Sequence, residues 1–136
     1  MYAPSPREDV NVARLALVVD DSMLIRHTVC RFLEERGFTA ESATNGAEAL
    51  EMLKATGLQP EVILTDLVMP VMTGGELIQQ LKADPTRNKI PIILLVSKRF
   101  PESPGEAKDA VYVIYKDIEI QEQLEKALIA AVGERY

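Results

Sequence analysis

The stretch "VILTDLVMP", residues 62–70, decides how this chain folds and where its chemistry lies. Three apolar residues and a threonine, the pattern of a buried strand, lead directly into Asp66, and no helix begins after that acid. An ionised carboxylate at the end of a buried strand costs free energy unless a neighbouring charge or hydrogen bond compensates it. Other parts of the chain must therefore supply the groups that face Asp66.

The strand pattern recurs along the chain. Residues 15–19, "LALVV", are apolar without alternation, which is typical of a strand buried on both faces of a sheet. Further short segments predict the remaining strands, at residues 38–43, 61–65, 92–96 and 111–114.

Helical patterns separate these strands. Ser22 is predicted to cap a helix that ends at Gly37. Asn45 is predicted to cap a shorter helix, with Gly57 just beyond its end. A third helix closes at "ADPTRN", and the prolines of residues 98–110 leave room for only a short fourth helix. The last helix carries apolar residues at helical spacing: Ile120, Leu124, Ala127, Leu128 and Ala131.

Strands that alternate with helices predict an α/β fold with a parallel sheet, formed by one domain over residues 14–136. Residues 1–13 hold prolines and acids in place of a signal sequence, so we expect a disordered leader on a cytoplasmic protein. The net charge of −6 argues against a nucleic-acid surface. No apolar run approaches the roughly 18 residues of a membrane span, and a single cysteine, Cys30, excludes an internal disulfide.

Polar residues stand at the ends of several predicted strands. Asp20 and Asp21 follow the first strand, Asp66 the third and Ser97 the fourth, and Lys116 lies at the end of the fifth. Taken alone, all but Asp66 have an ordinary explanation: a helix cap for the acidic pair, a turn for the serine and a solvated charge for the lysine. Because parallel strands bring their carboxyl ends to one edge, where open sheets bind ligands, we expect these residues to converge.

The converging groups predict phosphoryl chemistry with a metal ion. Three carboxylates in one place repel each other, so a cation is expected between them. Mg²⁺ suits a few carboxylates and takes phosphate oxygens among its other ligands. A phosphate would also explain the Ser97 hydroxyl as a hydrogen-bond donor and the Lys116 ammonium as a charge. Asp66 is then placed to attack a phosphorus atom and carry an aspartyl phosphate.

Four segments resemble the response-regulator receiver domain of two-component signalling, in particular its single-domain chemotaxis type. They are "LVVDDS", "VILTDLVMPVMTGGEL", "KIPIILLVS" and "VYVIYK", and the resemblance extends from Leu15 to about Val132. It implies a flavodoxin-like (βα)5 fold with a five-stranded parallel sheet in the order 2-1-3-4-5. Helices would cover both faces of the sheet, and the fourth helix would be short or irregular.

The resemblance also implies roles for individual residues. Asp66 would be the phosphoacceptor, and Asp20 and Asp21 would hold Mg²⁺, Asp20 through a water. The backbone carbonyl of Val68 would complete the protein's metal ligands. The family's hydroxyl and lysine positions, which would contact the phosphoryl group, correspond to Ser97 and Lys116.

The same resemblance predicts the partners. A sensor histidine kinase or a histidine phosphotransfer protein would donate the phosphoryl group to a stand-alone receiver, monomeric or weakly dimeric through its last helix. Output would then pass to a downstream protein through altered protein contacts, with the face of the fourth helix, fifth strand and last helix repacked. The chain would catalyse only its own phosphorylation and dephosphorylation.

Some positions depart from the family. Lys98 stands where Ala or Gly is usual, so it either extends into solvent or narrows access to Asp66. Asp117 replaces a proline with a cis peptide bond, so we expect a trans bond and a cap for the last helix. The segment between Ser97 and Lys116 is short, and Val113 replaces an aromatic residue of the output switch.

Two further positions predict slow self-dephosphorylation, because neither Val68 nor Arg99 can act as a base toward water. An alternative function is a phosphorylation-independent interaction module that keeps the receiver fold. A hydrolase with an aspartate nucleophile is disfavoured, since such sites need an acid two residues after the nucleophile. Asp66 has Val68 at that position, and Asp20 has Ser22.

Overall fold

The computed structural model describes residues 14–57, 59–97 and 108–133 and contains one five-stranded sheet in the order β2-β1-β3-β4-β5. All neighbouring strands pair in parallel, which confirms the predicted fold class and strand order. The strands are β1 (Leu15–Val19), β2 (Thr39–Ala43), β3 (Val62–Asp66), β4 (Ile92–Val96) and β5 (Tyr112–Tyr115).

The helices of the described residues begin and end close to the positions that the capping residues predicted for them. They are α2 (Met23–Glu34), α3 (Gly46–Thr56), α4 (Gly74–Lys82) and α6 (Ile120–Val132). Ser22 caps α2 by accepting a hydrogen bond from the Ile25 N–H, and Asn45 caps α3 in the same way. Gly57 ends α3 in the left-handed conformation, which glycine adopts without steric cost.

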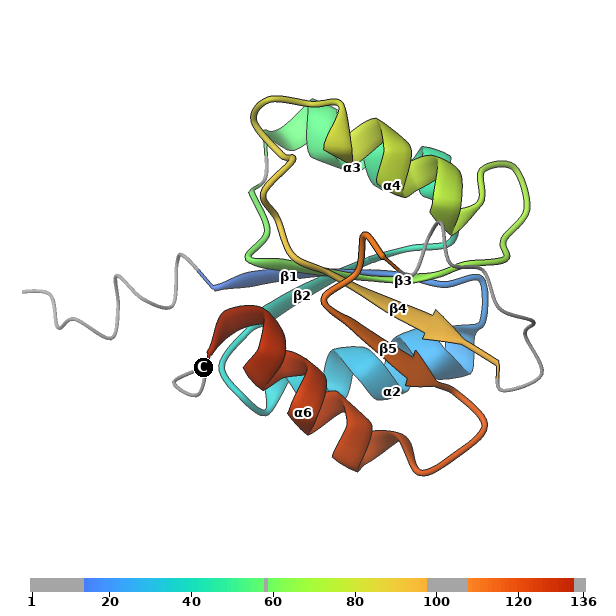
Figure 1. Cartoon of the computed structure of the whole chain (residues 1–136), viewed down its shortest axis with the longest axis vertical. Coiled ribbons are helices and arrows are strands. Elements are labelled where there is room, and N and C mark those ends of the chain that lie inside the picture. The colour runs from blue at the N-terminus through green and yellow to red at the C-terminus, as the bar shows by residue number, and fades with distance from the viewer. Residues whose placement is uncertain (1–13, 58, 98–107, 134–136) are drawn as a thin grey trace, which may run out of the picture.

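The sheet forms the middle layer of three. Figure 1 shows α3 and α4 on one face of the sheet and α2 and α6 on the other. Alternate residues of the central strands point to opposite faces, so Leu17 and Val19 pack with α3 and α4 while Ala16 and Val18 pack with α2 and α6. Strands β3 and β4 are buried along their whole length, which explains why β4 and the first three residues of β3 are apolar without alternation.

The structure corrects some details of the sequence-based prediction. The fifth strand lies one residue later than predicted, and α2 ends at Glu34, before Gly37. Asp117 does not cap the last helix. The N-cap of α6 is Glu119, whose carboxylate accepts a hydrogen bond from the Gln121 N–H. The helix begins later than predicted because residues 116–118 form a turn. The described residues contain no cis peptide bond, as expected for Lys116–Asp117.

The remaining predictions about elements fall on other parts of the chain. The leader of residues 1–13, Lys98, Arg99 and most of the segment expected to hold a fourth helix lie outside the described residues.

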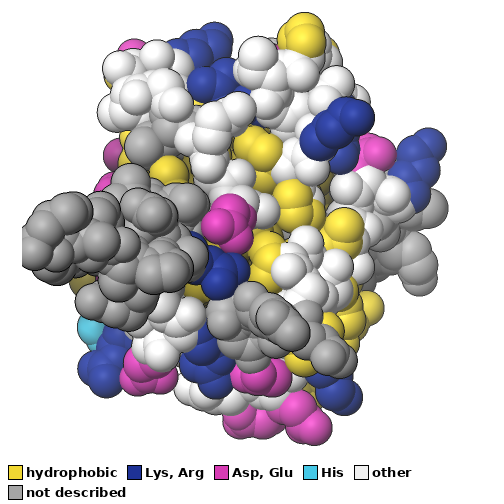
Figure 2. Space-filling view, turned by 90° about the vertical axis from the view of Figure 1, so that its left-hand side faces the viewer, with side chains coloured by type: hydrophobic (Ala, Val, Ile, Leu, Met, Phe, Trp, Pro, Cys, Tyr) yellow, Lys and Arg dark blue, Asp and Glu magenta, His cyan; other side chains and the backbone are white. Residues whose placement is uncertain are grey.

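On the face shown in Figure 2, acidic and basic side chains are interspersed with apolar ones among the described residues. No helix in these residues combines the length and the apolar character that crossing a membrane requires.

Candidate functional site

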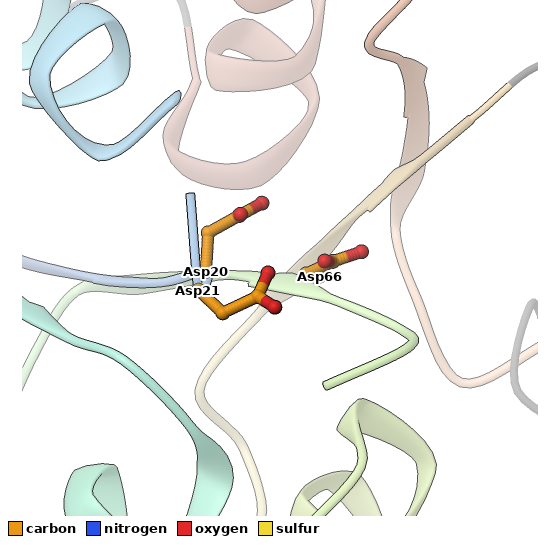
Figure 3. Close-up of side chains that lie close together, drawn as sticks. All are labelled: Asp20, Asp21 and Asp66. Carbon is orange, nitrogen blue, oxygen red and sulfur yellow. The ribbon is translucent and has the colours of Figure 1, made fainter. Parts of the chain in front are cut away.

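Three acids from two neighbouring strands meet at the carboxyl edge of the sheet. Asp20 and Asp21 directly follow β1, and Asp66 is the last residue of β3. Each contributes a carboxylate oxygen that lies within 4.8 Å of the other two, and Figure 3 shows the three side chains side by side. Asp20 is 0% exposed and Asp66 is 6% exposed, whereas Asp21 lies at the surface. The predicted convergence of these acids is therefore present in the fold.

Lys116 provides the charge that faces the two buried acids. Its Nζ lies 3.1 Å from Oδ2 of Asp20 and 3.1 Å from Oδ2 of Asp66. The lysine side chain is only 17% exposed. Ion pairs with so little solvent around them are weakly screened. The positive charge opposite Asp66 thus comes from the residue that directly follows β5, which is separated from β3 by β4.

Electrostatics at this edge follow from burial and proximity. Burial raises the pKa of Asp66, and the Asp20 carboxylate raises it further, whereas Lys116 and the Leu67 N–H only partly offset the rise. Burial alone would lower the pKa of Lys116, but Asp20 and Asp66 outweigh it and raise the pKa. Lys116 therefore stays positively charged, and its ammonium pairs with two of the three clustered carboxyl groups.

The donor set fits Mg²⁺. The three acids offer only oxygen ligands, at a spacing that a single small ion can bridge, and their charge exceeds that of Lys116. Because Asp21 lies at the surface, the cluster of acids is exposed to solvent on one side. The role of the Val68 carbonyl as a further ligand stays a prediction.

A cavity of about 300 Å³ lies beside Asp66. Its lining contains the remaining residues that the sequence predicted for the site, Val68, Ser97 and Lys116, together with Leu67 and Val96. A pocket with a carboxylate, a hydroxyl and an ammonium in its wall suits a phosphoryl group. All the predicted site residues are therefore brought to one edge of the sheet.

Two contacts that sequence reasoning missed hold Asp20 in place. The Ser22 N–H donates to Oδ1 of Asp20 over 2.9 Å. Arg26 Nη1 donates to the backbone carbonyl of Asp20 over 2.8 Å. Arg26 lies in the first turns of α2, directly after the acids, and that position was the only signal available in the sequence.

Gly74 is required by the close approach of α4 to the end of β3. The Leu67 N–H donates to Oδ1 of Asp66 over 2.7 Å, and the Gly74 N–H donates to the Leu67 carbonyl over 2.9 Å. A Cβ on Gly74 would lie 2.1 Å from the backbone oxygen of Asp66, far inside any real contact. Glycine at this position therefore lets the helix begin against the backbone that carries the acid.

The loop between β3 and α4 contains a strained turn. The Met72 N–H donates to the Pro70 carbonyl over 2.7 Å, and Val71 between them has φ of 68°. This combination is a γ-turn of the rare type with a positive φ, which costs free energy at a β-branched residue. The Gly46 N–H, at the start of α3, donates to the Met72 carbonyl over 3.2 Å and anchors the loop. Valine gives no sequence signal for such a turn.

Comparisons with solved structures agree with this fold. The chemotaxis response regulator CheY4 of Vibrio cholerae is 34% identical, with a TM-score of 0.76 over 88% of this chain and 98% of that chain. The signal receiver domain of a signal transduction histidine kinase from Syntrophus aciditrophicus is 29% identical, with a TM-score of 0.73 over 90% of this chain and 93% of that chain.

Sequence comparisons point the same way. Residues 16–128 match the family model described as response regulator receiver domain. Two-component response regulator ORR11 of Oryza sativa subsp. indica is 37% identical over 62% of this chain and 57% of its own length. Hybrid signal transduction histidine kinase D of Dictyostelium discoideum is 33% identical over 68% of this chain and 6% of its own length. The chain thus spans less than two thirds of these curated relatives.

Proposed function

This chain belongs to the response regulator receiver family, and from that premise we propose that it accepts a phosphoryl group on Asp66 in a Mg²⁺-dependent reaction. The donor is a sensor histidine kinase or a histidine phosphotransfer protein, and the phosphorylated chain signals through altered protein contacts. Named relatives that include a histidine kinase and a response regulator support this class of partner.

One observation carries the proposal: a nearly buried carboxylate, Asp66, lies beside two further acids and a lysine in the wall of a cavity. A buried carboxylate loses its solvation, and this cost in free energy must be offset by a partner or by a function. In the proposed reaction an oxygen of Asp66 attacks the phosphorus of phosphohistidine. The new P–O bond replaces the P–N bond, and the leaving imidazole takes a proton from solvent.

The surrounding residues have complementary tasks in this proposal. Asp20 and Asp21, with Asp66 and the Val68 carbonyl, hold Mg²⁺, and the bound ion supplies positive charge to the oxygens of the transferring group. Lys116 pairs with one of those oxygens. Ser97 donates a hydrogen bond to another, which links the phosphorylation state to the segment that follows β4.

The proposal is tested by incubating the protein with acetyl phosphate and Mg²⁺ and measuring its intact mass. We expect the gain of one phosphoryl group, which is lost in Asp66→Asn and when a chelator removes the metal. Asp109→Asn is the matched control, because this acid precedes β5 and lies at the opposite end of that strand. Its phosphorylation should equal that of the wild type.

The same experiment distinguishes the proposed function from the alternative, a phosphorylation-independent interaction module. A wild-type protein that gains no mass and binds no Mg²⁺ in a direct titration would be a phosphorylation-independent interaction module. A protein that binds Mg²⁺ but takes no phosphoryl group from acetyl phosphate would then be tested with a phosphorylated histidine phosphotransfer protein. Failure with that donor as well would overturn the proposal.

A further inference from the structure

Lys116 follows an edge strand, so its backbone is held by the sheet on one side only. β5 is the last strand of the sheet and pairs with β4 alone. On that inner side, the Lys116 N–H donates to the Val96 carbonyl over 2.7 Å. On the outer side, no further strand of the described residues pairs with the N–H and carbonyl of Tyr115, and edge groups of this kind need another partner.

The side chain of Gln123 supplies that partner. The Tyr115 N–H donates to Oε1 of Gln123 over 2.8 Å, and Nε2 of Gln123 donates to the Tyr115 carbonyl over 2.9 Å. This exchange of two hydrogen bonds with one residue is what a neighbouring strand makes in an antiparallel pair. Nε2 also donates to the Glu119 carbonyl over 2.9 Å, so both amide hydrogens and the oxygen of Gln123 are used.

The contact between Gln123 and Tyr115 joins helix α6 to the residue that precedes Lys116. Figure 1 shows α6, which carries Gln123, on the same face of the sheet as α2 and next to β5. The turn after Lys116 is closed by a long contact, from the Ile118 N–H to the Tyr115 carbonyl at 3.4 Å. The shorter bonds of Gln123 therefore fix the outer side of the backbone, as β4 fixes the inner side.

From this geometry we infer that Gln123 is a positioning residue, which holds the end of β5 so that the Lys116 ammonium stays between Asp20 and Asp66. The lysine side chain is long and flexible, and its two 3.1 Å contacts demand a fixed starting point. The inference rests on the proposed role of Lys116 in phosphoryl transfer, because Gln123 itself does not touch the reacting groups.

The first test compares phosphorylation rates with acetyl phosphate at saturating Mg²⁺. Gln123→Met keeps the length of the side chain and removes all three hydrogen bonds, and we expect phosphorylation to slow about tenfold through misplacement of Lys116. The control is Gln121→Met, at an exposed position two residues earlier whose side chain has no hydrogen bond within the described residues. Its rate should be unchanged, and a wild-type rate for Gln123→Met would overturn the inference.

A double-mutant cycle tests whether Gln123 acts through the lysine. In a Lys116→Ala background, Gln123→Met should cause no further slowing, because the group it positions is gone. If the two effects multiplied, Gln123 would act on the site by another route, and the inference would be wrong.

A measurement on the unphosphorylated protein keeps this inference separate from the proposed function. In Gln123→Met, we expect the Tyr115 amide to exchange with solvent at least about tenfold faster, while amides of β1 and β3 keep their protection. The side-chain ¹⁵N signal of Lys116 should also lose the slow exchange that its two ion pairs give it. These readouts decide the role of Gln123 even if the wild type takes no phosphoryl group. Unchanged readouts would overturn it.

Discussion

Asp66 is a charged group in a position that disfavours charge. It lies at the end of a buried strand, with Asp20 beside it and a lysine shared between the two. Burial is the largest cause of its raised pKa, and repulsion from Asp20 is the second. The ionised form of Asp66 is therefore unfavourable, and either a bound cation or protonation of the carboxylate would reduce that cost in free energy.

This state predicts that Asp66→Asn stabilises the metal-free protein. A carboxyl group whose pKa is raised by folding contributes stability below its unfolded pKa and loses that contribution as pH rises through the folded pKa. At pH 7 the neutral amide should therefore raise the free energy of unfolding, by about 1 kcal/mol. Urea denaturation in a chelator measures the difference.

The pH dependence provides the control for that experiment. As pH falls through the raised pKa of Asp66, the wild-type carboxyl protonates, and its disadvantage against asparagine should shrink. An Asp66→Asn protein that is less stable than the wild type at pH 7 would show that the ion pair with Lys116 outweighs burial and repulsion.

Val71 gives a second prediction at the scale of the residue. Its side chain is 82% exposed, so it contributes little packing, and its φ of 68° is strained for valine. Asparagine tolerates this conformation, so Val71→Asn should stabilise the protein by about 1 kcal/mol. Thermal unfolding measures the gain. Val68→Asn, also exposed but without a positive φ, is the matched control, and an equal gain there would contradict the explanation.

At the scale of the elements, the site depends on how closely the loops pack against the strand ends. Gly74 allows α4 to begin against β3, and Gly46 allows α3 to begin against the turn at Met72. The two glycines differ in what a new side chain would meet. Gly74 faces backbone, whereas Gly46 faces chiefly the flexible end of the Met72 side chain.

Gly74→Ala should therefore cost more than Gly46→Ala. A methyl group at Gly74 would force the backbone of Asp66 to move, and we expect a loss of about 3 kcal/mol and slower phosphorylation. At Gly46 the methionine can shift, so about 1 kcal/mol is expected. Urea denaturation of the two variants measures both losses, and similar values would mean that the approach of α4 is not the cause.

The elements also show what the sequence could and could not predict. Capping by Ser22 and Asn45 is a local matter, so the sequence indicated both helix starts correctly. At the last helix the sequence indicated Asp117, a favoured capping residue, but the turn at residues 116–118 moves the cap to Glu119. The contact of Arg26 had only its nearness to Asp20 in the sequence as a signal, and that of Gln123 was not predictable, because it depends on β5 lying at the edge of the sheet.

At the scale of the molecule, the fold brings together acids that lie far apart in the chain, and a bound cation should therefore stabilise the entire domain. A ligand that binds only the folded state adds RT ln(1 + [L]/Kd) to the free energy of unfolding. At a Mg²⁺ concentration of about ten times Kd, the expected gain is about 1.4 kcal/mol.

Asp21→Asn tests this linkage without disturbing the core, since Asp21 is the exposed member of the three acids. The variant should unfold at nearly the wild-type temperature in a chelator and should lose most of the rise that Mg²⁺ gives the wild type. Thermal scans with and without the ion measure both quantities. A full Mg²⁺ response in Asp21→Asn would remove this residue from the metal site.

The order of the strands along the chain also has a consequence for synthesis of the protein. A nascent chain leaving the ribosome carries β1 and its acidic pair well before β3, and it carries all three acids before it carries Lys116. Until β5 joins the sheet, Asp20 and Asp66 lack their ion pairs with Lys116, and the cavity beside Asp66 lacks that residue from its lining. If Asp66 accepts a phosphoryl group as proposed, a partly synthesised chain cannot offer the finished site, and phosphorylation would mark only molecules whose translation has passed β5.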